Sequence, residues 1–538
     1  MFTESIFCTN FATKIVITMQ NKLLFITAFL SVSAISMATN YYAAPGATGD
    51  GSSISTPGDL NNLASKTIQG GDSLFLLDGV YYVTATVDVK KAAGTAEKMT
   101  FVGAYPGAHP IIDGYKMTYN NNGQSNCLRT RVNYVHLRDI EVRYAGFKGF
   151  YICGSYNKVE NCVAHHCVDT GIQMKDAVGC TILNCDSYMN FDYEQGGTSS
   201  PDFGGNADGF CDKQFTGEGN TYINCRAWSN SDDGWDLYKR GTNSPVIFIN
   251  CITYNQAPEY YDFTGNPRLE TDKEWFDQIE GKTMTTSKNH TDTWYRTHYY
   301  NNGNKNGFKI GGAGVATDVN MYRCLAIANT VKGFDQNYTQ GDVKLYNCSA
   351  YDNKNNYHFG SAEMRSLDIK NSISYYSQAA DENPKNEWWK DIITTGNYTH
   401  SSNSWDMPGM APADADFASV EPASCIGERD SKGIFNVPTM CLVKGSKFID
   451  AGELIAGYED YKGSKPDLGW KEFDEDVPTA ISENLNVLNG ARRLNVYTLS
   501  GRLAGMVSDG RIEALNLPNG IYVVSDFDTN KAVKIRVR

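Results

Sequence analysis

The chain has 538 residues and a formal net charge of -13, and it contains 50 Gly, 33 Tyr and 12% aromatic residues. This length exceeds that of most single compact domains, and the abundance of Gly and aromatic residues is typical of strands and turns rather than helices. The acidic balance excludes nucleic acid as an expected partner, because a phosphate backbone needs a basic surface.

The N-terminal 38 residues form a predicted targeting segment. Residues 1–18 have the character of an upstream extension, and Met19 is the expected start. An apolar run over Leu23–Ile35 is followed by Ser36-Met37-Ala38, a pattern typical of a signal peptide cleaved after Ala38. The run is too short to span a bilayer, so we predict no transmembrane segment. The expected location is secreted, periplasmic or at the cell surface.

A cap and a long series of strands follow. Residues 56–68 have the pattern of a short amphipathic helix, which we expect to cover the open edge of the first strands. The strands are predicted to begin near Ser73 and to continue to about Gly452. We therefore assign residues 39–452 to one elongated domain.

Two short motifs recur along this domain in the same rhythm. One places Cys or Ser after a polar residue, mostly Asn, and the other places a large apolar residue after Gly. Their base interval is about 24 residues, which is typical of stacked repeats. The copies are Asn161-Cys162, Asn184-Cys185, Asn224-Cys225, Asn250-Cys251, Arg323-Cys324, Asn347-Cys348 and Asn371-Ser372, and Gly149-Phe150, Gly171-Ile172, Gly209-Phe210, Gly234-Trp235, Gly307-Phe308 and Gly333-Phe334.

Each repeat has room for short strands but not for two helices, so the predicted fold is all-β, a parallel β-helix with one coil per repeat. Equal positions then stack above one another. This predicts an inward ladder of small apolar thiols beside an Asn ladder that bonds along the stack. Exported proteins commonly form disulfides, but this spacing favours free, buried Cys.

Adjacent coils carry charged residues at equivalent positions. Alignment of the Gly-aromatic pairs places Asp208 level with Asp233, and Asp236 level with Lys309, while Asp232 precedes Asp233 directly. One wall of the β-helix therefore gathers all five side chains within two or three coils, which are about 4.8 Å apart.

Crowded carboxylates repel one another, and three arrangements would relieve the repulsion. They are a bound metal ion, a carboxylate dyad that shares a proton, and a solvated acidic turn. The stacked Asp208 and the nearby Lys309 favour the metal. Ca²⁺ suits an all-oxygen donor set, which needs no His or Cys, and this weighs against zinc. Burial and a nearby cation would lower the pKa of Lys309, so that its neutral amine could act as a general base.

Two long insertions precede coils of this wall, at 186–205 and at 254–302. The second is rich in aromatic residues, which either stack on sugar rings or pack a core of the loop's own. They are Tyr254, Tyr260, Tyr261, Trp275, Trp294, Tyr295, Tyr299 and Tyr300. Insertions on one face of a solenoid commonly form its binding face.

The C-terminal part differs from the repeats. Residues 453–483 form a predicted polar linker, and 484–538 carry alternating strands that predict a small β-sandwich. The segment Leu517–Val523 and the basic end resemble the C-terminal sorting domains of secreted Bacteroidetes proteins. A plain accessory or stalk domain is the alternative.

The motifs at 207–213, 230–237, 306–312 and 332–337 resemble polysaccharide lyase family 9, and the similarity covers roughly 39–452. The resemblance implies a right-handed parallel β-helix that cleaves the pectin backbone by β-elimination. It places the calcium ligands at Asp208, Asp232, Asp233 and Asp236 and the catalytic base at Lys309. Lys213 and Arg240 are candidates for holding other carboxylates of the polymer.

The expected protein is thus a monomeric, calcium-dependent lyase acting on an acidic plant cell-wall polysaccharide, either polygalacturonate or the rhamnogalacturonan I backbone. Two other hypotheses remain. One is an inverting polygalacturonase-type hydrolase that uses Asp208, Asp232 and Asp233 as acid and base. The other is a non-catalytic glycan-binding protein, in which Lys309 has no chemical role.

Overall fold

The computed structural model describes residues 38–119, 124–193, 204–274, 276, 297–379, 390–396, 398–430 and 432–474, and four strands within 494–537. Residues 1–37 of the predicted targeting segment lie outside the described residues. Among the residues that are described, no helix is long and apolar enough to cross a membrane.

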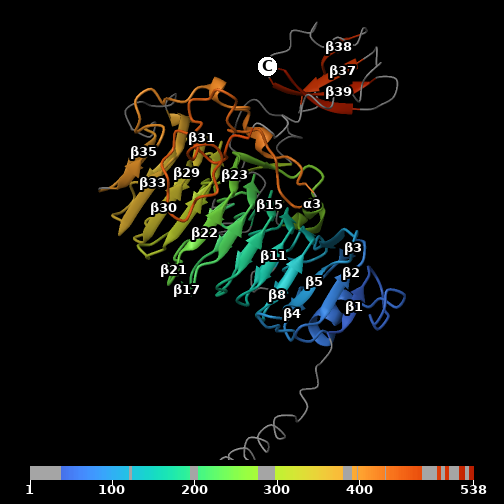
Figure 1. The fold of residues 1–538 in the computed structure, drawn as a ribbon. Coiled ribbons are helices and arrows are strands. Elements are labelled where there is room, and N and C mark those ends of the chain that lie inside the picture. Colours follow the sequence, from blue (N-terminus) through green and yellow to red (C-terminus); the bar gives the residue numbers. More distant parts are fainter. Residues whose placement is uncertain are drawn as a thin grey trace, which may run out of the picture. The chain divides into compact units, whose positions relative to one another are not determined.

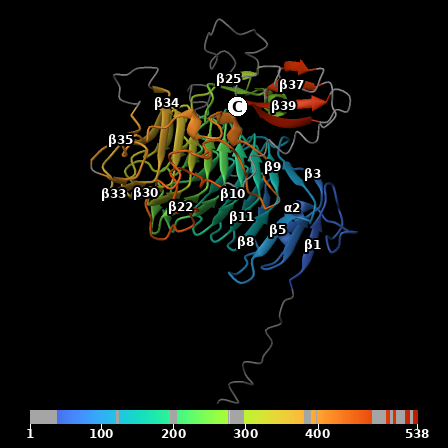
Figure 2. The same ribbon diagram turned by 45° about the horizontal axis from the view of Figure 1, so that its top comes forward.

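The chain winds into a parallel β-helix with three sheets, as predicted (Figures 1 and 2). Consecutive strands enter different sheets, and each sheet gains one strand per coil. The A sheet consists of β1 (Asn40–Ala43), β2 (Ser73–Leu76), β5 (Thr100–Ala104), β8 (Val135–Arg138), β11 (Lys158–Glu160), β14 (Thr181–Leu183), β18 (Thr221–Ile223), β22 (Val246–Ile249), β27 (Val319–Tyr322), β30 (Asp342–Tyr346), β33 (Ser366–Lys370) and β36 (Thr399–Ser401).

The other two sheets have ten strands each. The B sheet consists of β3 (Gly79–Tyr82), β6 (Pro110–Asp113), β9 (Glu141–Arg143), β12 (Val163–His165), β15 (Asp186–Tyr188), β19 (Arg226–Trp228), β23 (Ile252–Tyr254), β28 (Leu325–Ile327), β31 (Ser349–Asn353) and β34 (Ile373–Ser377). The C sheet consists of β4 (Val87–Val89), β7 (Leu128–Thr130), β10 (Phe150–Ile152), β13 (Ile172–Met174), β16 (Phe210–Asp212), β20 (Trp235–Asp236), β26 (Phe308–Lys309), β29 (Lys332–Asp335), β32 (Asn355–Phe359) and β35 (Ile392–Thr394).

The Gly-aromatic motif starts the C-sheet strands and builds the core. The rings of Phe210, Trp235 and Phe308 stack along the β-helix, with centroids 4.5 and 4.9 Å apart. The preceding glycine has no room for a side chain, because a Cβ on Gly234 would lie 2.6 Å from the carbonyl oxygen of Gly307. Gly at this position therefore lets neighbouring coils approach while the next residue fills the interior.

The Asn ladder and the buried Cys ladder are both confirmed. Asn184 Nδ2 donates to Asn161 Oδ1 at 3.0 Å, and Asn224 Nδ2 donates to Asn184 Oδ1 at 3.1 Å. Each of these residues has a φ of 52–54°, in the left-handed region that Asn tolerates better than most residues. The Cys that follows each of them is buried, and all the described Cys are free thiols.

The N-terminal cap also forms. Helix α2 (Leu60–Asn62) begins after Asp59, whose Oδ1 accepts a hydrogen bond from Asn62 N at 2.9 Å, and a helical turn, η1 (Leu63–Thr67), continues it. Leu60 and Leu63 are buried in the core beside β4. The strands begin earlier than predicted, because β1 precedes the cap and joins the A sheet ahead of β2.

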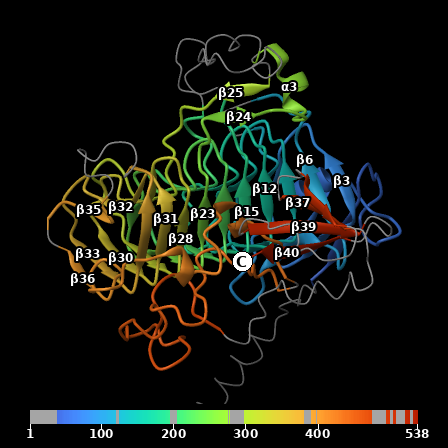
Figure 3. The same ribbon diagram turned by 90° about the horizontal axis from the view of Figure 1, so that it is seen from above.

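The other end of the domain differs from the prediction. The coils end at β36, and residues 402–474 form an irregular segment with the short turns η4 (Asp414–Asp416) and η5 (Pro422–Cys425). This segment packs against the B sheet (orange in Figure 3) and buries Phe417, Leu468 and Trp470 with Ile373. The predicted linker at 453–483 is therefore wrong up to residue 474, since that part contributes to the core.

Smaller elements decorate the coils. The pair β17 (Thr216–Gly217) and β21 (Gly241–Thr242) is parallel. The long insertion contains β24 (Tyr260–Asp262), α3 (Arg268–Thr271) and β25 (His298–Tyr300), and β24 pairs with β25 antiparallel. Figure 3 shows these insertion elements together at one side of the stack.

The C-terminal strands form a separate antiparallel sheet in the order β38-β37-β39-β40. They are β37 (Leu494–Thr498), β38 (Leu503–Val507), β39 (Gly520–Asp526) and β40 (Ala532–Val537). Residues 512–515, within the segment predicted to carry alternating strands, lie outside the described residues. The described strands make one sheet, whereas the sequence predicted a sandwich.

The Asn ladder provides a test of how the coils are held in register. Asn184→Ala removes the side-chain bonds to Asn161 and Asn224 and leaves a φ of 54° that Ala adopts with strain. We expect it to lower the free energy of unfolding by about 2–4 kcal/mol. Asn184→Gly loses the same bonds without the strain, so its loss is about 1 kcal/mol smaller. Urea unfolding followed by circular dichroism measures both, and equal losses would contradict the contribution of the backbone conformation.

Candidate active site

The candidate site lies on the outer face of the C sheet, across β16, β20 and β26. Cys211 pairs with Asp236, and Asp236 pairs with Lys309. Two residues before Cys211, Gly209 N donates a hydrogen bond to the carbonyl oxygen of Asp233 on the next coil, at 2.9 Å. The structure therefore confirms the predicted alignment of these coils. Because side chains alternate between the faces of a strand, Asp236 and Lys309 point outward while Trp235 and Phe308 point into the core.

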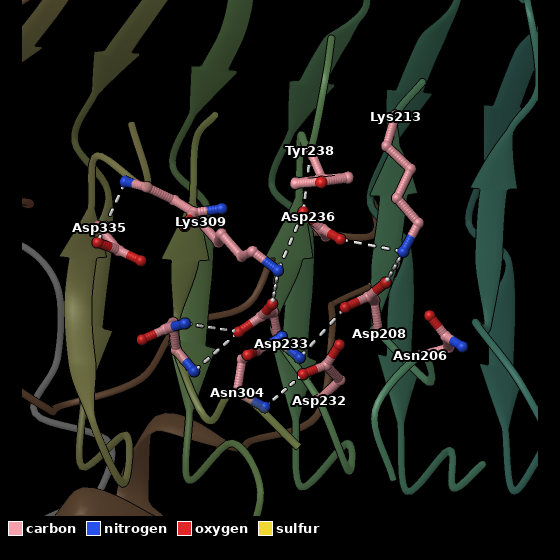
Figure 4. Close-up of polar contacts among 12 residues, drawn as sticks. Asn206, Asp208, Lys213, Asp232, Asp233, Asp236, Tyr238, Asn304, Lys309 and Asp335 are labelled. Carbon is pink, nitrogen blue, oxygen red and sulfur yellow. Dashed lines mark hydrogen bonds and ion pairs between the residues drawn. The ribbon is translucent and has the colours of Figure 1, made fainter. Parts of the chain in front are cut away.

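Three carboxylates meet at this face. Asp208, Asp233 and Asp236 each offer an oxygen, and these oxygens lie within 4.8 Å of one another (Figure 4). Asp233 N donates to Asp208 Oδ1 at 3.2 Å, and Tyr238 N donates to Asp236 Oδ1 at 2.8 Å. Asn306 donates to Asp233 Oδ1 through its backbone N at 3.0 Å and its Nδ2 at 2.9 Å. Each carboxylate is thus fixed by a backbone donor that leaves other oxygen lone pairs available.

Asp232 is a neighbour of this group rather than a member of it. Its side chain is also buried, and its Oδ1 accepts a hydrogen bond from Asn304 N at 2.5 Å. The four predicted ligands therefore divide into three convergent carboxylates and a fourth beside them.

Two lysines enter the group from opposite sides (Figure 4). Lys309 Nζ lies 2.9 Å from Asp233 Oδ2 and 3.5 Å from Asp236 Oδ1. Lys213 Nζ lies 3.1 Å from Asp208 Oδ2 and 3.0 Å from Asp236 Oδ2. Both were predicted site residues, and the structure brings both to the carboxylates. Lys213 pairs with two carboxylates of the protein itself. Its ammonium group is therefore not placed to hold a carboxylate of the polymer apart from them.

The electrostatics follow from burial. Burial, with a smaller opposing effect of Lys213, raises the pKa of Asp208 to about 8. Burial and the neighbouring Asp233 hold the pKa of Asp232 well above its ordinary value. Burial acts on Asp236 in the same direction, but Lys213 and Lys309 together bring its pKa below the ordinary value.

Lys309 differs from the expectation. Burial alone would lower the pKa of its ammonium, as predicted, but the surrounding carboxylates outweigh burial and raise it well above the ordinary value. Asp233 and Asp236 make the largest contributions to this rise. Without a further cation, Lys309 is a charged counterion.

The donor set fits a hard divalent cation. Asp208, Asp232, Asp233 and Asp236 carry four negative charges when ionised, and Lys213 and Lys309 supply two positive ones, which leaves two negative charges in a buried cluster. Carboxylate oxygens suit Ca²⁺, which takes six to eight oxygen ligands. The adjacent Cys211 is a poor ligand, because burial raises the pKa of its thiol well above the ordinary value.

Arg240 lies elsewhere. Its side chain has 0% exposure, its Nε donates to Asp212 Oδ1 at 2.8 Å, and its Nη1 donates to the carbonyl of Gly241 at 2.5 Å. Asp212 occupies an inward position of β16, so the pair lies inside the coil. The prediction that Arg240 holds a substrate carboxylate is therefore wrong, because a guanidinium without exposed surface cannot reach a polymer.

Sequence reasoning missed Asn304 and Tyr238. Asn304 fixes Asp232, and the ring of Tyr238 lies 5.9 Å from Lys309 Nζ. A Cβ on Gly312 would overlap this ring. The Gly311-Gly312 pair after β26 was therefore the sequence feature that could have indicated a side chain packed at this point.

The described aromatic residues of the long insertion pack in different places. Tyr261 and Tyr299 are buried with Phe263 and Phe276 in a cluster that the insertion shares with Phe191 and Tyr193, and Arg268 anchors it by donating to the carbonyl of Met117 at 2.6 Å. Tyr254 packs instead beside the segment that covers the B sheet. Tyr260 and Tyr300 form a half-buried pair, with centroids 6.1 Å apart. Trp275, Trp294 and Tyr295 lie outside the described residues.

Comparisons with known proteins agree with this fold. The family model described as "Pel9A-like, right handed beta helix region" matches residues 40–267 and 273–375, more than half of the chain. Pectate lyase L of Dickeya dadantii (strain 3937) is 28% identical over 459 residues, which cover 81% of this chain and 91% of that protein.

Solved structures share this fold. The crystal structure of pectate lyase Pel9A superposes with a TM-score of 0.65 at 27% identity and covers 82% of this chain and 98% of that one. A rhamnogalacturonan lyase superposes with a TM-score of 0.57 at 21% identity, covering 76% and 97%, which indicates a shared fold.

A stability measurement tests the position of Arg240. Arg240→Met leaves Asp212 buried without its ion-pair partner, so we expect the free energy of unfolding to fall by about 3–5 kcal/mol. Adding Asp212→Asn removes the unpaired charge and restores part of the loss. Urea unfolding of the single and double variants measures both, and a loss below about 1 kcal/mol in the single variant would contradict the buried role.

Proposed function

The chain belongs to the Pel9A-like right-handed β-helix family and is a polysaccharide lyase, and from this premise we propose that it is a calcium-dependent pectate lyase that cleaves polygalacturonate by β-elimination. The observation that carries the proposal is the position of Lys309, whose Nζ lies 2.9 Å from Asp233 Oδ2 in a buried cluster of carboxylates. The predicted targeting segment supports export, which would bring the enzyme to plant cell-wall pectin.

In the proposed mechanism Lys309 is the general base. Its neutral amine takes the proton from C5 of a galacturonate unit, and the electron pair of that C–H bond becomes the C4–C5 double bond. The C4–O bond breaks, and the departing oxygen takes up a proton to become a hydroxyl. One product thus carries an unsaturated sugar at its new non-reducing end.

The carboxylates would hold the calcium ion. Asp208, Asp233 and Asp236 supply convergent oxygens, with Asp232 beside them. The chemistry that Ca²⁺ supplies when bound is withdrawal of charge from the uronate carboxylate, which acidifies the C5 proton. Asn306 and the backbone N of Tyr238 keep Asp233 and Asp236 oriented, so the cluster is organised before substrate arrives.

The geometry disfavours the hydrolase alternative. Inverting glycosidases need their two carboxyl groups about 6.5–9.5 Å apart, to leave room for a water molecule. Asp208 and Asp233, two of the three carboxyl groups in that hypothesis, have oxygens within 4.8 Å of one another, and an ammonium group pairs with each of them. A cluster this tight suits a cation better than a water molecule.

The function is tested by incubating the purified protein with polygalacturonate and with rhamnogalacturonan I, with and without Ca²⁺. We expect an ultraviolet-absorbing unsaturated product from polygalacturonate, formed only with Ca²⁺. Product from rhamnogalacturonan I instead would transfer the same mechanism to that backbone. Saturated products formed in the presence of a chelator would overturn the lyase assignment.

Replacement of the base gives a second test. Lys309→Met removes the only group in the proposed mechanism that accepts the C5 proton, so we expect kcat to fall by about 10²–10⁴-fold. Lys344→Met, which removes an exposed lysine on the A sheet, is the matched control and should keep wild-type activity. Circular dichroism and thermal unfolding check that both variants fold. Substantial turnover by a folded Lys309→Met protein would support a non-catalytic role for Lys309.

The pH dependence follows from the same lysine. Only the neutral amine accepts a proton, so activity is lost as the pH falls below the pKa of Lys309, which the carboxylates hold well above its ordinary value. Calcium offsets their charge and should move the alkaline rise in kcat to lower pH. Profiles of kcat against pH at low and saturating Ca²⁺ measure the shift, and a rise at the same pH in both would contradict this coupling.

A further inference from the structure

Lys213 occupies a different place in the cluster from Lys309. It follows β16 on the first of the three coils, and its Nζ lies between Asp208 Oδ2 at 3.1 Å and Asp236 Oδ2 at 3.0 Å. Lys309 binds the other side, at Asp233 Oδ2 and Asp236 Oδ1. Asp236 is thus shared, with one oxygen toward each ammonium group (Figure 4).

The side chain of Lys213 is built into the protein. It is 12% exposed, and the two carboxylates that it contacts are 0% and 3% exposed. A lysine that serves only a passing polymer would extend into solvent, where its ammonium stays hydrated. The ion pairs instead commit this ammonium to two of the three carboxylates that would hold the cation.

We propose that Lys213 is an internal counter-cation that competes with the divalent ion for Asp208 and Asp236. This inference rests on the calcium site of the proposed function and names the residue that sets its affinity. In the absence of Ca²⁺, the ammonium limits repulsion within the cluster and keeps the coils at β16 and β20 together. A calcium ion held by Asp208 and Asp236 would compete with Lys213 for these two carboxylates.

The charges give the direction of each effect. When all four carboxylates are ionised, as they would be around a divalent cation, the two ammonium groups leave two negative charges, and without Lys213 three remain. A more negative cluster attracts a divalent cation more strongly and repels itself more strongly when no cation is bound. Removal of the Lys213 charge should therefore raise calcium affinity and lower cation-free stability together.

The same pair of effects distinguishes this role from simple structural support. A lysine that only positions Asp208 and Asp236 for the metal would weaken calcium binding when it is removed. A lysine that binds the polymer would change KM and leave calcium binding unaltered. Only a competing counter-cation predicts tighter binding of the ion.

The experiment measures Ca²⁺ binding directly, by titration calorimetry on the full chain without substrate. We expect Lys213→Gln, which keeps a hydrogen-bond donor but no charge, to bind Ca²⁺ about tenfold tighter than the wild type or better. Lys213→Arg keeps the charge and should stay within about threefold of the wild type, and Lys344→Met controls for loss of a distant surface charge. Unchanged or weaker binding by a folded Lys213→Gln protein would overturn the inference.

Thermal unfolding gives an independent measurement. In chelator, Lys213→Gln should unfold at a lower temperature than the wild type, and saturating Ca²⁺ should raise its unfolding temperature by more than it raises that of the wild type. If Lys213→Gln does not fold in chelator but folds with Ca²⁺, the counter-cation role is supported, and failure to fold in both conditions overturns it. Absence of calcium binding by the wild type would instead contradict the proposed function.

Discussion

In-register parallel pairing between neighbouring coils is the constraint on which the rest of this structure depends. It places equal positions of successive repeats above one another, and so it turns a rhythm along the chain into columns across the molecule. The same pairing stacks Phe210, Trp235 and Phe308 inside, links Asn161, Asn184 and Asn224 at a turn, and gathers the carboxylates outside. A shift of one residue in the coil of β20 would move Asp236 to the core face, because side chains alternate between faces.

The site gathers like charges at a cost that the surrounding chain offsets locally. Burial strengthens the repulsion among Asp208, Asp233 and Asp236, and it equally strengthens their attraction to the ammonium groups of Lys213 and Lys309. Backbone donors add fixed positive ends, such as the N–H of Asp233 that binds Asp208. The cluster is consequently organised around positive charge before any ion enters.

The additions to the coils serve the same framework in different ways. Residues 402–474 cover the apolar B sheet and bury Trp470. This segment therefore stabilises the coils around Lys309. The insertion after β23 shares an aromatic core with Phe191 and Tyr193, and Arg268 anchors it to a loop of an earlier coil. Tyr238, which lies against Gly312, completes the side of the site that faces Lys309.

The sequence by itself determined the columns, because a period of about 24 residues fixes which positions stack in a β-helix. From this rhythm follow the fold, the Asn and Cys ladders, and the level at which Asp208, Asp233, Asp236 and Lys309 lie. Tertiary structure alone decided the direction and burial of each charged side chain. Arg240 and Lys213 were both predicted to hold carboxylates of the polymer, yet Arg240 pairs with Asp212 inside the coil and Lys213 lies among the carboxylates of the site. It also decided the charge of Lys309 and the end of the coils at Ser401, since both depend on contacts between residues far apart in the chain, which no local pattern records.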